Sequence, residues 1–192
     1  MIATIVLFGA SRRVGKDTAA DMLMTELRAA DADRRLGRYS FAQALRSEVA
    51  DSLRIVRGRV DNALDVWTED PTIKESVVRP LLIAWGRARR HQKSNYWAEC
   101  VAEQILSDRP KVAVISDWRY PNEAEVLGQV PRYRTIKIHV SRPGISPAGD
   151  EAVNDPLCRE MADFQWENNG TLDNLKETVH NFIQSNLTHE TD

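Results

Sequence analysis

The N-terminal thirty residues constrain the fold more than any other part of this chain. The apolar run IATIVLF, at positions 2–8, is short and rich in β-branched residues, which is typical of a buried strand. From about position 15 to 30, apolar residues recur every three or four positions, which predicts a helix with one face on a sheet. The turn between them carries glycines and a lysine, in the stretch LFGASRRVGKDTAA. Strand, glycine turn, lysine and helix in this order predict a phosphate-binding loop.

The spacing within this turn departs from the usual motif. Five residues separate Gly9 from Gly15, where four are usual, and Asp17 stands where Ser or Thr is common. Either the loop is one residue longer, or Ala10 takes the place of the first glycine. Both alternatives keep Lys16 where a lysine reaches the outer phosphates, behind backbone N–H groups that turn toward an anion. The predicted nucleotide-binding residues of this segment are Gly9, Ala10, Arg13, Val14, Gly15, Lys16, Asp17 and Thr18.

Downstream, further strand patterns alternate with helical ones. The stretches GRYSF, VAVIS, YRTIKIHV and FQWE are predicted strands, and Thr171 is predicted to open a final amphipathic helix. Such alternation implies a mostly parallel sheet covered by helices on both faces, with ligands at the carboxyl ends of the strands. We expect one domain over residues 1–192, with a helical insert at about 54–108. The Pro- and Gly-rich segment 141–160 is predicted to be a loop that can close as a lid.

The charge and cysteine content narrow the possible partners. Lys and Arg number 26 against 28 Asp and Glu, so the net charge of −2 gives no overall attraction to nucleic acid or acidic membranes. Stable nucleic-acid binding and membrane association are therefore not expected. Two isolated cysteines do not make a disulfide framework, which favours a reducing, cytoplasmic setting.

Several motifs together resemble one enzyme family. GKDT, YSFAQALRSEVADSL, RPLLIAWGRARRHQKSNYWAECV, VISDWRYPNEAEVL and NNGTLDNL occur in the order found in bacteriophage-type deoxynucleoside monophosphate kinases, relatives of adenylate kinase. The resemblance implies a P-loop kinase fold of three α/β/α layers, with a five-stranded sheet, a helical insert for the nucleoside monophosphate and a lid. It implies ATP and Mg²⁺ as cofactors, a deoxynucleotide substrate in the host cytoplasm, and a possible homodimer.

The resemblance also assigns roles to individual residues. Thr18, two places after the lysine, would face the magnesium ion. Ser40 and Phe41 correspond to the turn that leads to the monophosphate site. Asn169 and Gly170 fall in the Asn-Gly-Thr-Leu turn and are expected near the nucleotide.

A basic segment indicates where an acceptor phosphate binds. Residues 79–93 contain five Arg or Lys and no acidic residue, although the protein is slightly acidic overall. Arg grips a phosphate with two parallel hydrogen bonds. Aromatic side chains in and near this segment could stack on a base, although such residues are more often core. The predicted substrate-binding residues here are Arg79, Trp85, Arg87, Arg90 and Trp97.

A carboxylate and two arginines complete the predicted site. Asp117 follows the buried run VAVIS, so it should emerge at the carboxyl end of a strand, where a substrate or magnesium ion binds. Helix capping is the alternative role for this Asp. Arg119 is predicted to contact the same substrate and to be catalytic together with Lys16. Arg142 or Arg159 is predicted to close from the lid onto the phosphates as a further catalytic cation.

These features predict transfer of phosphate from ATP to a (deoxy)nucleoside monophosphate. Catalysis would rest on alignment of the reactants and on positive charge around the transferred group. Two alternatives remain open. One is a kinase acting on another acceptor, such as a hydroxymethylated base in phage DNA, and the other is a protein that binds nucleotide without transferring phosphate.

Overall fold

Five parallel strands form one central sheet in the computed structural model, which describes residues 3–57 and 69–187. The strand order is β2-β3-β1-β4-β5, and each neighbouring pair is parallel. The predicted α/β class is confirmed, and the sheet is parallel throughout. The strands are β1 (Ala3–Gly9), β2 (Leu36–Tyr39), β3 (Val112–Trp118), β4 (Tyr133–Ser141) and β5 (Phe164–Glu167).

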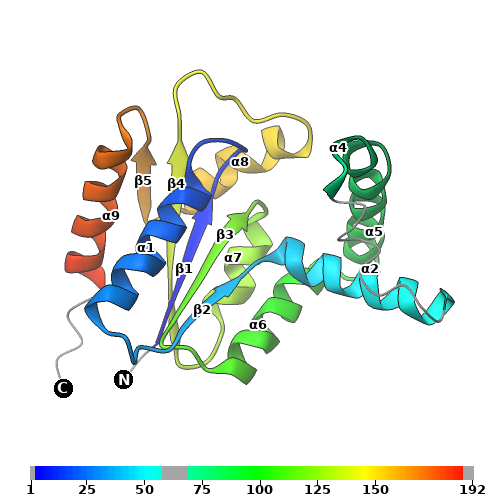
Figure 1. Ribbon diagram of the computed structural model, residues 1–192, viewed down its shortest axis with the longest axis horizontal. Coiled ribbons are helices and arrows are strands. Elements are labelled where there is room, and N and C mark those ends of the chain that lie inside the picture. The colour runs from blue at the N-terminus through cyan, green and yellow to red at the C-terminus, as the bar shows by residue number, and fades with distance from the viewer. Residues whose placement is uncertain (1–2, 58–68, 188–192) are drawn as a thin grey trace.

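Helices cover both faces of this sheet, so the protein has three layers (Figure 1). Alternation along β1 separates two cores: Val6 and Phe8 pack with α1 and α9, whereas Ile5 and Leu7 pack with α6 and α7. The helical elements are α1 (Lys16–Ala30), α2 (Phe41–Arg57), α4 (Pro71–Ile73), a π-helical turn η1 (Lys74–Val78), α5 (Arg79–Gln92), α6 (Tyr96–Asp108), α7 (Pro121–Gly128), α8 (Asp150–Met161) and α9 (Leu172–Asn186).

The helical insert lies to one side of the sheet, where α4 and α5 are joined to it through α2 (Figure 1). Its small core contains Val49 of α2 and Val78 at the end of η1. The π turn closely precedes Pro80, whose ring has no N–H to donate to an upstream carbonyl. Part of the predicted insert, residues 58–68, lies outside the described residues. The insert's boundaries as a substrate-binding unit stay a prediction.

The predicted lid is only half loop, because residues 150–161 form α8. The sequence prediction was wrong for this half. Glycines fall only in the first part of the segment, where Gly144 and Gly149 adopt φ angles of 78° and 61°. Pro156 lies inside the helix, and Glu151 is an acidic residue of the first turn, which favours a helix N-terminus. In the described part of the chain, no helix is long and apolar enough to cross a membrane.

Candidate functional site

The phosphate loop begins at Ala10. Gly9 is the last residue of β1 and pairs with both neighbouring strands, opposite Trp118 and His139. A Cβ on Gly9 would lie 2.5 Å from Cε3 of the Trp118 ring, so only glycine fits at this position. The glycine at position 9 is therefore explained by the close packing of β1 against Trp118 of β3. Ala10 to Gly15 has the usual four-residue gap, which favours the second of the two alternatives that the sequence left open.

A distant asparagine holds the far end of the loop. Gly15 adopts a φ of 101° and is the N-cap of α1. The Asn168 side chain donates to the Val14 carbonyl at 2.8 Å, and its Nδ2 occupies the space that a Cβ on Gly15 would need. Arg13 is exposed and adopts a φ of 63°. Because Asn168 belongs to the turn after β5, its hydrogen bond to Val14 fixes the loop in place.

Lys16 and Asp17 form the polar centre at the start of α1. The Lys16 side chain is buried, and its Nζ lies 3.4 Å from Oδ2 of Asp17. Ser116, near the end of β3, donates to Oδ1 of Asp17 at 2.6 Å, and Arg38 donates to Ser116 at 2.8 Å. Burial raises the pKa of Asp17, but the hydrogen bond from Ser116 and the charge of Lys16 outweigh it and lower the pKa. Asp17 is thus ionised beside Lys16, and the exposed Thr18 follows it on the helix.

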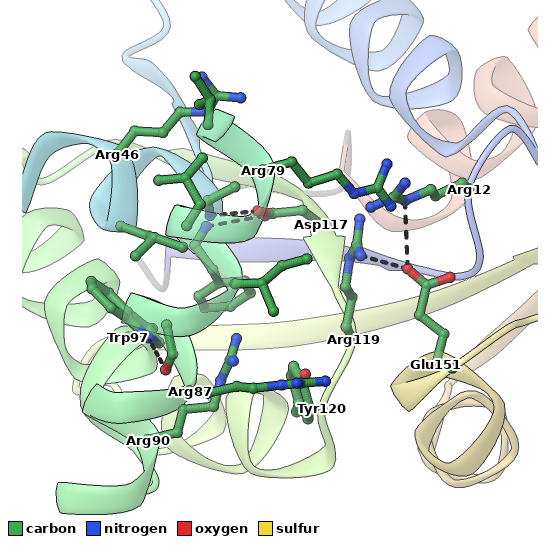
Figure 2. Close-up of a pocket in the computed structure, with 18 of the residues that line it drawn as sticks. Arg12, Arg46, Arg79, Arg87, Arg90, Trp97, Asp117, Arg119, Tyr120 and Glu151 are labelled. Carbon is green, nitrogen blue, oxygen red and sulfur yellow. Dashed lines mark hydrogen bonds and ion pairs between the residues drawn. The ribbon is translucent and has the colours of Figure 1, made fainter. Parts of the chain in front are cut away.

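A cavity of about 680 Å³ lies beside this loop, between α2, η1, α5, the segment after β3 and the start of α8. Its volume is in the range of small-molecule sites. Figure 2 shows side chains from these elements converging on the cavity. An apolar part and a charged part can be distinguished in its lining. The apolar part includes Phe41, Leu45, Val78, Leu82 and Trp97, and the basic residues are Arg12, Arg46, Lys74, Arg79, Arg87, Arg90 and Arg119.

At the charged end, Arg12 and Arg119 pair with the carboxylate of Glu151, and Arg79 from a third segment points toward the same space (Figure 2). Arg119 NH1 lies 2.5 Å from Oε1 of Glu151, and Nε of Arg12 lies 3.9 Å from the same oxygen. Arg79 pairs with Glu75 at 3.1 Å, one helical turn before it. Burial and the positive charges of Arg79 and Arg119 lower the pKa of Arg12. Cations are therefore crowded together here, as an anion site requires.

Asp117 lines the cavity, but its carboxylate caps α2. It accepts hydrogen bonds from the Ser40 hydroxyl at 2.7 Å and from the backbone N–H groups of Phe41 and Ala42 at 3.1 and 2.8 Å. The structure thus brings Asp117, Ser40 and Phe41 together, as a cap that fixes α2 against β3. Capping is the alternative that the sequence left open for Asp117, and the carboxylate that touches Lys16 belongs to Asp17 instead. A metal role for Asp117 stays a prediction.

Glu123 is part of the cavity lining and positions Arg119 through the backbone. Its side chain is 3% exposed, and Oε2 accepts from the backbone N–H groups of Arg119 at 2.9 Å and Tyr120 at 3.1 Å. Burial raises the pKa of Glu123 to about 8, and the charge of Asp117 adds to the effect. The turn that presents Arg119 therefore depends on a buried carboxyl group that carries a proton near neutral pH.

The two predicted tryptophans have different surroundings. Trp97 is 2% exposed, lines the cavity and donates to the Gly86 carbonyl at 3.3 Å. Trp85 donates to Glu48 at 2.7 Å and packs in the small core of the insert. Only Trp97 of the two is placed where it can contact a bound ring.

The two predicted arginines of α5 both belong to the cavity. Arg87 and Arg90 are part of its lining. The Arg90 guanidinium lies 4.3 Å from the centre of the Tyr120 ring, a cation–π contact that holds it against the segment after β3. The structure therefore brings these arginines to the same cavity as Arg79 and Arg119.

The remaining predicted residues lie away from the cavity. Arg142 is exposed and is not part of its lining, and the lid segment reaches the cavity through Ala148, Gly149 and Glu151 instead. Asn169 donates to Glu167 at 3.1 Å. A Cβ on Gly170 would meet Asn174 at 2.6 Å, so this glycine serves the turn into α9.

Sequence reasoning missed several residues of the site, among them Arg12, Asn168, Glu151 and Gly86. Arg12 stood in the quoted loop beside Arg13, and Asn168 stood beside Asn169, so both lay within a motif but one position from the chosen residue. Glu151 carried no signal, because a lone Glu in an acidic segment resembles ordinary surface. Gly86 had one signal, since a glycine inside a helix is unfavourable without a packing or functional reason.

The start of α1 offers oxygen ligands suited to Mg²⁺. Asp17 is an ionised carboxylate, and Thr18 adds a hydroxyl at the start of the same helix. Among the residues that the structure describes, no group of three or more His, Cys, Asp or Glu could hold a metal by itself. Mg²⁺ in nucleotide enzymes commonly uses one or two protein ligands together with substrate phosphates. The oxygen ligands of Asp17 and Thr18 therefore fit this ion.

Known proteins resemble this chain in fold and not in sequence. No family model and no curated protein sequence matches the chain. Shikimate kinase from Acinetobacter baumannii, solved in complex with shikimate, matches with a TM-score of 0.50 and 16% identity over 100% of this chain and 97% of that one. A candidate kinase from Chloroflexus aurantiacus reaches a TM-score of 0.46 at 14% identity, over 96% of this chain and 97% of that one. The chain has the three-layer fold of P-loop kinases.

Proposed function

We propose that this protein transfers a phosphoryl group from ATP to a (deoxy)nucleoside monophosphate. The observation that carries the proposal is the divided cavity beside the phosphate loop. One end is lined by apolar side chains, including Phe41 and Trp97, and the other by the guanidinium groups of Arg12, Arg79 and Arg119. A planar aromatic base, whose faces can pack on apolar side chains, linked through a sugar to a phosphate matches this division of surface.

On the donor side, the start of α1 would hold the phosphates of ATP. The first N–H groups of a helix have no partner within it, and the helix dipole favours an anion there. Lys16 adds a charge at the same end of α1, and its buried amine has little freedom to move. Asp17 and Thr18 would hold a magnesium ion, whose charge would offset the negative charge that accumulates during transfer.

On the acceptor side, the arginines would fix the attacking phosphate in line with the donor. Arg12 belongs to the phosphate loop itself, whereas Arg119 follows β3 and Arg79 begins α5. Because the charged end of the cavity includes a loop residue, acceptor and donor phosphates would lie next to each other. Phosphoryl transfer needs this alignment more than covalent chemistry by side chains.

The test is ADP formation from ATP and Mg²⁺ with each ribo- and deoxynucleoside monophosphate in turn. We expect ADP to rise only with particular acceptors. Lys16→Ala should lower kcat by about 100-fold or more, as for removal of a main electrostatic group. Lys176→Ala, the same change on the exposed face of α9, is the matched control and should leave the rate unchanged.

Two results would contradict the proposal. If ATP binds but no nucleoside monophosphate raises turnover, the acceptor is of another class or the protein only binds nucleotide. If Lys16→Ala turns over as fast as Lys176→Ala, the start of α1 is not the donor site.

A further inference from the structure

Glu151 lies where an acceptor phosphate would bind. It is a carboxylate, 18% exposed, at the charged end of the cavity. Its Oε1 lies 2.5 Å from Arg119 NH1 and 3.9 Å from Nε of Arg12. In Figure 2 the guanidinium groups of Arg12, Arg79 and Arg119 point toward the same space. A carboxylate against an arginine fork makes the same contacts that a phosphate oxygen makes.

The charges around this space do not cancel. Arg12, Arg79 and Arg119 carry three positive charges, and Glu75 and Glu151 carry two negative ones, so the group as a whole stays positive. Replacing Glu151 by the dianion of a phosphate monoester would bring the balance to zero. A neutral ligand in the same place would instead leave two positive charges uncompensated. Electrostatics thus favours the exchange only for a phosphorylated ligand.

From these contacts we infer that Glu151 occupies the acceptor phosphate site of the unliganded protein and makes the site specific for a phosphorylated acceptor. An uncharged molecule, such as a nucleoside, cannot take the place of the carboxylate, because it would leave Arg12 and Arg119 without their anion. A phosphate monoester can. Glu151 is thus a specificity-determining residue of the site, and the inference rests on the proposed function for the identity of the acceptor.

Displacement of Glu151 also changes the constraints on α8. Glu151 is in the first turn of this helix, two residues after Gly149 with its positive φ. Its ion pairs join the start of α8 to the segment after β3 and to the phosphate loop. Binding of phosphate would break these links and free the first turn of α8 to move.

The experiment measures binding of inorganic phosphate without ATP or any nucleotide, so its result does not depend on the acceptor. Titration calorimetry compares the wild-type protein with Glu151→Gln and Glu75→Gln. Both changes remove one negative charge from the cavity, but Glu75 forms its ion pair with Arg79 and acts on Arg12 only through a weaker electrostatic interaction than that of Glu151. We expect Glu151→Gln to bind phosphate about 5- to 50-fold more tightly and Glu75→Gln about 2-fold more tightly.

Hydrogen exchange of the wild-type protein gives a second result that needs no variant. We expect phosphate to increase exchange at the amides that begin α8, because the ion pairs of Glu151 are broken. Equal tightening by both variants would overturn the inference, since net charge alone would then explain the effect. Weaker binding by Glu151→Gln, or exchange in α8 that phosphate does not alter, would overturn it as well. Absence of kinase activity with nucleoside monophosphates would contradict the proposed function and leave these results interpretable.

Discussion

The phosphate loop and the acceptor cavity are built in different ways. The loop is one stretch of chain, held in place by Asn168, by the Trp118 ring against Gly9, and by Ser116 against Asp17. The cavity takes its lining from α2, the π turn and α5, the segment after β3 and the start of α8. Its charged end contains a carboxylate of the protein itself. The phosphate loop is therefore preformed, whereas the proposed acceptor site would have to rearrange when its ligand binds.

Glu123→Gln tests whether the protonated carboxyl group beneath Arg119 affects the stability of the folded protein. The pKa of Glu123 is raised to about 8 in the folded protein, so the folded state holds a proton that the unfolded state releases above about pH 4.5. The stability that this group contributes is fully present below about pH 4.5 and is lost as pH rises from there through about 8. Gln keeps an oxygen for the Arg119 and Tyr120 amides without a titration. We expect the variant to lie close to wild type at pH 5 and to exceed it by up to about 4 kcal/mol at pH 9.

Urea unfolding at the two pH values measures this difference. The matched control is Glu125→Gln, the same change on the same helix at a position where the side chain is exposed. That variant should follow the pH dependence of wild type. If Glu123→Gln loses stability between pH 5 and 9 as steeply as Glu125→Gln, the buried carboxyl group is not the source.

Arg119→Ala should affect the acceptor without affecting the donor. The proposed contact to the acceptor phosphate would be lost, and kcat/KM for the acceptor should fall by about 100-fold, while the KM for ATP changes less than about 2-fold. Steady-state kinetics with each substrate varied separately measures both. Arg142→Ala is the control, because Arg142 is exposed and outside the cavity lining. An equal loss in the Arg142 variant would instead support the lid arginine that the sequence predicted.

Asn168→Ala tests the preformed state of the phosphate loop. The change removes the hydrogen bond to the Val14 carbonyl and the contact with Gly15. We expect the free energy of unfolding to fall by about 1 kcal/mol and the KM for ATP to rise several-fold. Thermal unfolding and ATP kinetics measure the two effects. Asn169→Ala should change neither, because Asn169 contacts Glu167 on the exposed side of the turn; a larger effect there would restore the residue that the sequence singled out.

The contrast between a loop formed by one stretch of chain and a cavity lined by distant segments explains how much the sequence could predict. Strand and helix order followed from periodicity, and Lys16 from a local motif, because neighbours in the chain decide both. The partners of Asp117 could not be predicted in this way. A carboxylate after a buried strand fits a metal site and a cap equally well, and only the packing of α2 against β3 brings Ser40 to it. Glu151 depends on α8 within a segment whose prolines and glycines indicated a loop.

Gly86→Ala is the smallest and sharpest test of the acceptor side. Gly86 is inside α5 and lines the cavity, and a Cβ there would lie 3.4 Å from Leu45 and 3.9 Å from Trp97. These are ordinary contacts, so the fold has room for a methyl group. Because alanine is the better helix former, the variant should be more stable by roughly 0.5–1 kcal/mol.

The added methyl group would project beside the apolar end of the cavity, where the ring of the acceptor is proposed to lie. We therefore expect the KM for the acceptor to rise several-fold although the melting temperature increases by a few degrees. Ala88→Gly, at an exposed position of the same helix, is the reciprocal control and should lower stability without changing this KM. If Gly86→Ala gains stability and keeps its KM, the ring does not approach the backbone of α5. A gain in stability at the expense of acceptor binding would show why α5 retains a glycine in its interior.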